Sequence, residues 1–178
     1  MYYLIILYLT LPCFIANLLP VLAAKTNILS RLNYPVDGHA TLFGKRVFGD
    51  HKTWRGFIVG IFGAMVVAII QYFLYDLNLV SWIDFFSFGQ FLLFGFLSGL
   101  GALLGDTLES FFKRRVGVAS GKSFFPFDQI DYIIGFVILT NFLIGWTWKD
   151  ILFLLLFSML IAPLISGFGY LTNIKKVH

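Results

Sequence analysis

Residues 105–131 read GDTLESFFKRRVGVASGKSFFPFDQID and carry eight charged side chains of both signs. This polar stretch lies between two segments that contain no Asp, Glu, Lys or Arg, 85–105 and 132–148. Charged groups beside a membrane are costly to desolvate, so such a cluster indicates a site that binds something charged. A metal ion and phosphate are the first candidates.

The remainder of the chain is predominantly apolar. Hydrophobic residues make up 59% of the 178 residues and charged residues only 12%, which favours an integral membrane protein over a soluble domain. A helix needs about 17–25 mainly apolar residues to cross a bilayer. Five uncharged segments meet that length: 1–24, 56–75, 85–105, 132–148 and 151–174. We therefore predict an all-α integral membrane protein, a single domain over 1–178 with five transmembrane helices.

The first apolar segment has a second interpretation, a cleaved secretory signal, because Ala23 and Ala24 are small. No basic residue precedes the segment and the apolar run is long, so we favour a membrane helix. Pro12 and Pro20 within it predict a kink or an early end. A buried helix tolerates such prolines when its neighbours bind the carbonyls that they leave free.

The basic residues are distributed unevenly along the chain. Ten of the thirteen Lys and Arg residues lie in two polar loops, 25–55 and 106–131. By the positive-inside bias these loops and the C-terminal tail are cytoplasmic, and the N-terminus is outside. We expect a multi-pass protein of the cell membrane with its active site at the cytoplasmic face. Its net charge of +4 favours anionic lipid head groups and nucleotides, and no nucleic acid partner is expected.

Glycines recur at helical spacing in two of the predicted helices. The repeats are Gly56, Gly60 and Gly63 in the second helix and Gly95, Gly99, Gly101 and Gly105 in the third. Stripes of small residues let helix backbones approach closely in a membrane. Packing between helices of one chain is the favoured interpretation, and a homodimer through these faces is the alternative.

Four acidic side chains bracket the polar stretch as two pairs, Asp106 with Glu109 and Asp128 with Asp131. If the third helix continues beyond its apolar part, Asp106, Glu109 and Lys113 lie on one of its faces. Helix capping or a salt bridge explains one such pair. Two pairs around one loop favour Mg²⁺, which binds one or two carboxylates, waters and substrate phosphates. Asp106, Asp128 and Asp131 are therefore the predicted metal ligands.

Basic residues in the same stretch suit phosphate oxygens, and Gly117 and Gly121 let the backbone approach them. These cations are Lys113, Arg114, Arg115 and Lys122. Before the second helix, Lys52, Thr53 and Arg55 offer two cations and a hydroxyl for phosphate, although a basic, aromatic interface belt explains them equally well. No Walker loop, Gly-x-Ser-x-Gly elbow or His-Glu-x-x-His pattern occurs, so covalent catalysis is not indicated.

Three elements of the chain, in their order, resemble the motifs of the CDP-diacylglycerol synthases. They are Lys52-Thr53-Trp54-Arg55-Gly56, Gly105-Asp106-x-x-Glu109-Ser110-x-x-Lys113-Arg114 and Asp128-x-x-Asp131. The resemblance covers about half of the chain, residues 50–135. The short chain and the five-span plan are most similar to the archaeal branch, the CDP-archaeol synthases.

Members of that family transfer the cytidylyl group of CTP to a membrane lipid phosphate, release pyrophosphate and require Mg²⁺. The resemblance implies that Asp106, Asp128 and Asp131 are catalytic and bind the metal. It implies that Lys52, Lys113, Arg114 and Lys122 contact phosphates. The predicted substrate site also includes Thr53, Arg55, Glu109 and Ser110. For the archaeal branch the acceptor is unsaturated archaetidic acid, an isoprenoid ether lipid phosphate, and the product is CDP-archaeol.

The chain departs from the bacterial pattern in and around the segment 119–127. Ala119-Ser120 replaces a Lys-Asp pair, a Gly-His-Gly-Gly stretch is missing after Pro126, and Gln129 and Arg55 replace an Arg and a Glu. These departures argue for a different lipid from the bacterial one. Segment 119–127 is the predicted place of substrate choice.

Two other classes of function fit parts of the sequence. A small ion- or proton-coupled transporter would use intramembrane carboxylates, but it predicts acids near the middle of a span. A scaffold would use the glycine stripes but leaves the clustered charges unexplained. Within the enzyme class, a CDP-diacylglycerol synthase that acts on an ester lipid is the alternative.

Overall fold

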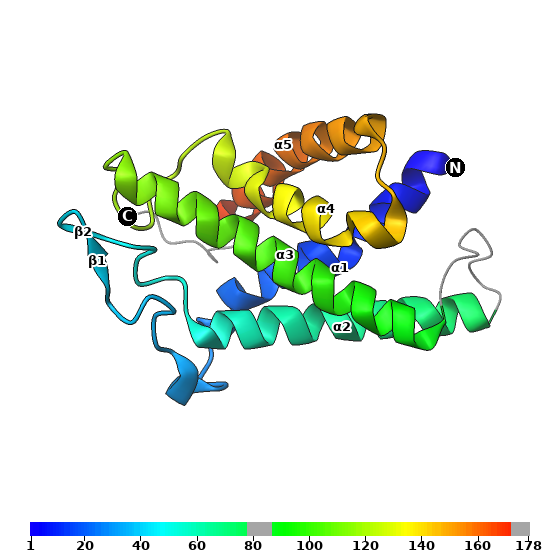
Figure 1. Ribbon diagram of the computed structural model, residues 1–178, viewed down its shortest axis with the longest axis horizontal. Coiled ribbons are helices and arrows are strands. Elements are labelled where there is room, and N and C mark those ends of the chain that lie inside the picture. The colour runs from blue at the N-terminus through cyan, green and yellow to red at the C-terminus, as the bar shows by residue number, and fades with distance from the viewer. Residues whose placement is uncertain (78–86, 172–178) are drawn as a thin grey trace.

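The computed structural model of the protein describes residues 1–77 and 87–171, and within them the chain forms five α-helices (Figure 1). The helices are α1 (Tyr2–Ala23), α2 (Trp54–Asp76), α3 (Phe88–Arg115), α4 (Asp131–Ile144) and α5 (Trp148–Leu171). Short 3₁₀ turns η1 (Ser30–Leu32) and η2 (Phe127–Gln129) and a two-stranded hairpin of β1 (Thr41–Leu42) and β2 (Lys45–Arg46) complete the fold. The all-α prediction is confirmed.

Two helix boundaries differ from the sequence prediction for local reasons. Helix α3 does not stop at residue 105 but continues to Arg115, because no helix breaker precedes Gly117, whose φ is +87°. Helix α4 ends at Ile144 and not at 148, because Gly145 takes the left-handed conformation at φ 68°. Helix α5 consequently begins at Trp148. The predicted boundaries at 85 and 174 lie outside the described residues.

The prolines of α1 are accommodated by contacts with α2. Pro12 cannot donate to the carbonyl of Tyr8, and the amide Nε2 of Gln71 donates to that carbonyl at 2.6 Å instead. Near Pro20, the carbonyl of Ala16 lies against Gly60, where a Cβ would stand only 2.8 Å from the oxygen. Neighbouring helices thus stabilise the interrupted backbone, as the sequence predicted.

Helix α3 lies at the centre of the bundle and uses its small residues on two faces (Figure 1). Gly95 and Gly99 touch α2, where added Cβ atoms would meet backbone atoms of Met65 and Ile61. On the other face, a Cβ at Gly105 would collide with the carbonyl of Asp131. The stripe therefore packs helices within the chain, as the favoured interpretation predicted, and a homodimer stays an untested alternative.

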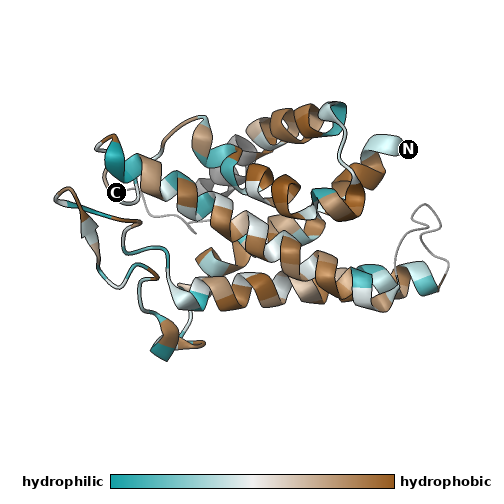
Figure 2. Cartoon of the chain, viewed as in Figure 1, coloured by the Kyte–Doolittle hydropathy of each residue, from teal (hydrophilic) through white to brown (hydrophobic). Residues whose placement is uncertain are grey.

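The surface of the bundle is apolar along most of its length. Figure 2 shows hydrophobic residues over the helices and hydrophilic ones gathered at the C-terminal end of α3 and in the loops beside it. Among the described residues, α1, α2 and α3 are long and apolar enough to cross a membrane, and α4 is a shorter apolar helix. Large exposed side chains such as Phe62 and Leu160 need a hydrocarbon environment. This surface fits a multi-pass membrane protein.

Candidate active site

The first polar contact at the end of the bundle joins two predicted site residues. Lys52 Nζ lies 2.5 Å from Asp106 Oδ2, although the two residues are 54 positions apart in the chain. The hydroxyl of Thr53 caps α2 by accepting the backbone N–H of Gly56 at 3.2 Å. This cap fixes where α2 begins and so holds Lys52 over α3.

A second charged cluster lies one turn farther along α3. Lys113 Nζ is 2.6 Å from Asp128 Oδ1 and 3.5 Å from Glu109 Oε1. Asp128 Oδ2 also accepts the backbone N–H of Phe124 at 2.5 Å. Partial burial opposes ionisation of Asp128, but the bonds from Lys113 and from the Phe124 N–H prevail and lower its pKa. The predicted face of Asp106, Glu109 and Lys113 therefore exists because α3 continues past the apolar segment.

Asp131 connects the two clusters. It begins α4, its side chain is buried, and its Oδ1 accepts the N–H of Tyr132 at 2.6 Å. Gly105 lets its backbone approach α3 closely, so the charges of Asp106, Lys52 and Asp128 act on its carboxylate. Two like charges this close favour a cation between them.

The carboxylates in the described part of the chain offer Mg²⁺ few protein ligands. Within residues 1–77 and 87–171, no group of three acidic, His or Cys side chains converges on one point. Asp128 faces Lys113, whereas Asp106 and Asp131 are neighbours. A pair of carboxylate oxygens is the donor set that Mg²⁺ takes when waters and substrate phosphates complete its shell.

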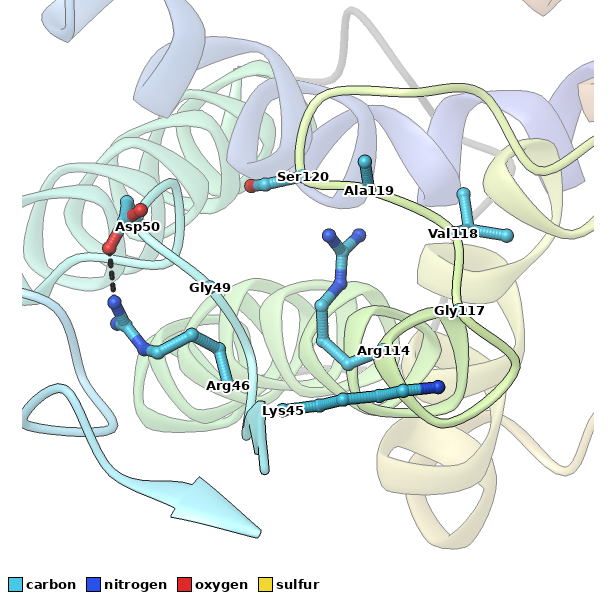
Figure 3. Close-up of a pocket in the computed structure, with 9 residues that line it drawn as sticks. All are labelled: Lys45, Arg46, Gly49, Asp50, Arg114, Gly117, Val118, Ala119 and Ser120. Atoms are coloured by element: carbon cyan, nitrogen blue, oxygen red, sulfur yellow. Dashed lines mark hydrogen bonds and ion pairs between the residues drawn. The ribbon is translucent and has the colours of Figure 1, made fainter. Parts of the chain in front are cut away.

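A cavity of about 330 Å³ lies between the hairpin loop and the segment after α3 (Figure 3). It is lined by Lys45, Arg46, Gly49, Asp50, Arg114 and residues 117–120. In Figure 3 the side chain of Arg114 extends into the space between the two loops. Arg114 is only 8% exposed, and within the described part of the chain its Nε has no hydrogen-bond partner. A buried cation left in this state needs an anion.

Asp37 organises the hairpin side of the cavity. Its side chain is 1% exposed and accepts bonds from Arg46 Nη2 at 2.8 Å, Phe48 N at 3.0 Å and Gly49 N at 3.2 Å. Burial alone would raise the pKa of Asp37, but these bonds outweigh it and lower the pKa to about 2. Arg46 also binds Asp50 at 2.5 Å, so one buried carboxylate holds two residues of the cavity wall.

Arg115 holds the same hairpin from the other side. Its guanidinium donates to the carbonyls of Leu42, Lys45 and Arg46, and Lys45 Nζ returns a bond to the Arg115 carbonyl at 3.2 Å. The guanidinium also lies over the ring of Phe111 at 5.2 Å. The sequence suggested phosphate binding for Arg115, but its Nη1 and Nη2 groups donate to the protein backbone.

Of the predicted site residues, all of which are in the described part of the chain, Arg114 alone is among those that line this cavity, and the three carboxylates, Lys52 and Lys113 are not. Arg55 is buried and donates to the carbonyl of Thr26 at 3.3 Å, which ties the start of the first polar loop to α2. Ser110 is buried within α3. Lys122 is exposed in the loop after α3 and is not among the residues lining the cavity.

Sequence reasoning did not place the hairpin residues in the site. Phe43 and Gly44 have φ of 51° and 73°, which forms the two-residue turn expected of a right-handed hairpin. The turn directs Lys45 and Arg46 toward α3. The sequence did contain a signal for these residues: Gly44 is followed by two cations, Lys45 and Arg46, in a loop predicted to lie on the same side of the membrane as Arg114.

Comparisons with known proteins identify the family of the chain. The model of the CarS-like family, described as CDP-archaeol synthase, matches residues 1–178. CDP-archaeol synthase of Archaeoglobus fulgidus is 32% identical, over 96% of this chain and 94% of its own length. That of Thermococcus onnurineus is 34% identical, over 94% and 91%. A solved structure of an intramembrane enzyme for archaeal membrane lipid biosynthesis superposes with a TM-score of 0.68 at 26% identity, covering 90% of this chain and 91% of that one. The chain belongs to the CDP-archaeol synthase family.

Proposed function

We propose that the protein transfers the cytidylyl group of CTP to unsaturated archaetidic acid, an isoprenoid ether lipid phosphate, and forms CDP-archaeol and pyrophosphate. Membership of the family supports the reaction class. The structural observation that carries the proposal is Arg114, a buried cation aimed into a basic cavity at the polar end of an apolar bundle. Such a cavity suits the triphosphate of a nucleotide, because charge-assisted bonds to phosphate are strong in a partly buried site.

The reaction requires positioning and charge neutralisation. A phosphate oxygen of the lipid attacks the α-phosphorus of CTP, a P–O bond forms, and the bond to the β-phosphate breaks as pyrophosphate leaves. The attacking oxygen is already an anion, so no strong base is needed. In our proposal Arg114 and Lys45 hold the triphosphate, beside Arg46, which Asp37 and Asp50 fix in the cavity wall. Lys52 and Lys113 exchange their carboxylate partners for phosphate oxygens as the substrates bind.

Asp106 and Asp131 are the residues that would hold Mg²⁺, with Asp128 as the third predicted ligand. Bound Mg²⁺ would neutralise charge that develops on the leaving pyrophosphate. Thr53, Arg55, Glu109 and Ser110 support the site from beneath, since each is a cap or is buried. Lys122, exposed in the loop after α3, is the predicted phosphate contact that must move toward the substrate.

We further propose a topology of five spans with the N-terminus outside and the active site at the cytoplasmic face. The positive-inside bias supports it, because the cavity cations belong to the two most basic segments of the chain. The three carboxylates lie at one end of the bundle and not at mid-span, which counts against an ion or proton relay.

One assay tests the function. The purified full-length protein is incubated with radiolabelled CTP, Mg²⁺ and either unsaturated archaetidic acid or a diacyl phosphatidic acid. We expect label in the ether lipid and release of pyrophosphate. Label only in the diacyl lipid would assign the ester substrate instead. If neither lipid is labelled, while proteoliposomes of the same protein pass ions without CTP, the transporter interpretation replaces the enzyme.

A further inference from the structure

A second cavity, of about 500 Å³, lies on the outer side of α3 and α4. Its walls are apolar and come from three elements. Helix α3 contributes Leu108 and Phe112, α4 contributes Ile134 and Ile138, and the loop between the helices contributes Phe124 and Phe127. We call this cavity the α3–α4 groove. It is separate from the basic cavity, with which it shares no lining residue.

The groove opens on the surface that would face hydrocarbon. Leu108, Phe112, Ile134 and Ile138 are all exposed, Ile138 by 66%, although their side chains are apolar. An open apolar groove on a membrane helix pair is accessible to lipid chains from the bilayer without passage through water. The chemistry of the walls therefore selects a hydrocarbon ligand.

The inner end of the groove reaches the reacting groups. Glu109 and Asp131, both only 8% exposed, line it together with Gly105. Asp131 is within reach of the charges of Asp106 and Lys52. A lipid lying in the groove would thus bring its polar end to the site where the phosphate must react.

We propose that the α3–α4 groove binds one isoprenyl chain of the lipid substrate, with the glycerol phosphate at its Glu109–Asp131 end. The inference rests on the proposed function and adds the place and the basis of chain recognition. Gly105 and Gly135 line the floor of the groove, where their lack of side chains lets the backbones of α3 and α4 pack directly against each other. Phe124 and Phe127 stack at 5.0 Å between ring centres and form a firm wall at the mouth.

The length of the groove sets what it can recognise. Ile138 is seven residues beyond Asp131 along α4, which corresponds to about 10 Å of helix. A geranylgeranyl chain is roughly twice as long as a geranyl chain and extends past this limit into the bilayer. The groove therefore contacts the methyl branches of the isoprenyl chain that are nearest the glycerol. Differences near the far end of the chain should affect binding less.

Substitution of Ile134 tests this placement. Ile134→Trp fills the middle of the groove, and Ile58→Trp is the matched control, because Ile58 is equally exposed on α2 and does not line the groove. We measure initial rates in mixed micelles with geranylgeranyl and geranyl diether phosphates. Ile134→Trp should raise the KM for both lipids by about tenfold or more with the KM for CTP unchanged, and Ile58→Trp should change neither.

Ile138→Trp tests the length. It blocks the outer end, so it should raise the KM for the geranylgeranyl lipid and leave the geranyl lipid within about twofold of wild type. Thermal unfolding in detergent checks each variant, and Ile134→Phe replaces Ile134→Trp if the latter unfolds early. Equal kinetics for the Ile134 and Ile58 variants would overturn the proposal that the groove binds an isoprenyl chain. Equal effects of Ile138→Trp on both lipids would also overturn it. A wild-type protein that labels no lipid would instead overturn the proposed function.

Discussion

Two buried carboxylates, Asp131 in the first turn of α4 and Asp150 in the first turn of α5, have opposite surroundings. Asp150, 4% exposed, accepts the hydroxyl of Tyr2 at 2.7 Å and both the N–H and the hydroxyl of Thr147, at 2.9 and 2.8 Å. Asp131, 8% exposed, accepts the N–H of its neighbour Tyr132 and lies in the field of Asp106. Uncharged donors bind the carboxylate of Asp150, whereas the negative charge of Asp106 repels the carboxylate of Asp131.

The same contrast separates two neighbouring arginines. The Nη1 and Nη2 groups of Arg115 donate to three backbone carbonyls, whereas the side chain of Arg114 makes no hydrogen bond or ion pair within the described part of the chain. The Nε of both arginines is buried without a partner among the described residues. A satisfied buried charge stabilises the fold, and an unsatisfied one destabilises it until a ligand arrives. Arg114 and Asp131 both lie at the polar end of the bundle, so we interpret the difference as one between ligand-binding groups and structural groups.

Of the substitutions that test this contrast, Asp131→Asn should have the largest effect on activity. The substitution keeps the shape but removes the charge proposed to hold Mg²⁺, so we expect turnover to fall by about 10²–10³-fold or more. The unfolding temperature should stay equal or rise, because repulsion with Asp106 is relieved. Radiolabel transfer and thermal unfolding measure the two effects. Asp76→Asn, at the exposed far end of α2, is the control, and full activity of Asp131→Asn would remove this residue from the site.

The arginine pair should separate binding from stability. Arg114→Ala removes an unpaired cation from the cavity and should raise the KM for CTP by about 10–100-fold without lowering the unfolding temperature. Arg115→Ala removes the bonds that hold the hairpin and should lower the unfolding temperature. Kinetics at varied CTP and thermal unfolding are compared for both. A lower unfolding temperature and an unchanged KM for Arg114→Ala would show that Arg114 is structural.

The sequence predicted the features that depend on residues close together in the chain, such as the positions of the helices and the residues that share a helix face. Uncharged runs located the helices, and the spacing of Asp106, Glu109 and Lys113 predicted their common face once α3 continued past the apolar segment. The ion pair of Lys52 with Asp106 joins segments 54 residues apart, and no local pattern specifies it. The cavity wall was missed for the same reason, because Arg46 meets Arg114 only through the tertiary fold.

Asp37 extends the comparison to a satisfied acid that supports the site. Asp37→Asn turns an amide donor toward the N–H groups of Phe48 and Gly49, so the wall should loosen and the KM for CTP should rise by about tenfold. The pKa of Asp37 is about 2 in the fold against 3.8 for a free Asp side chain. Its stabilising contribution is therefore complete above pH 3.8 and is lost as the pH falls through about 2.

The unfolding temperatures of wild type and Asp37→Asn should accordingly converge between about pH 4 and pH 2. Asp76→Asn, compared with wild type over the same range, supplies the baseline. A difference for Asp37→Asn that stays constant with pH would contradict the assigned bonds. Rescue of the CTP affinity by Asp37→Glu, whose carboxylate can still accept these bonds, would identify a positioning role over a merely structural one.

Asp150→Asn should have the smallest effect on activity. The amide can still accept from Tyr2, but its NH₂ group must face the donors of Thr147, so we expect a loss of about 1–3 kcal/mol in stability. Activity per folded molecule should equal that of wild type, because Asp150 lies in the first turn of α5, beyond the end of α4 that is opposite to Asp131. Unfolding in detergent and rates normalised to folded protein measure both. If Asp150→Asn lowered turnover without lowering stability, hydrogen-bond satisfaction would not distinguish structural acids from functional ones in this bundle, and the assignment of Asp131 would depend on the kinetics of its own variant.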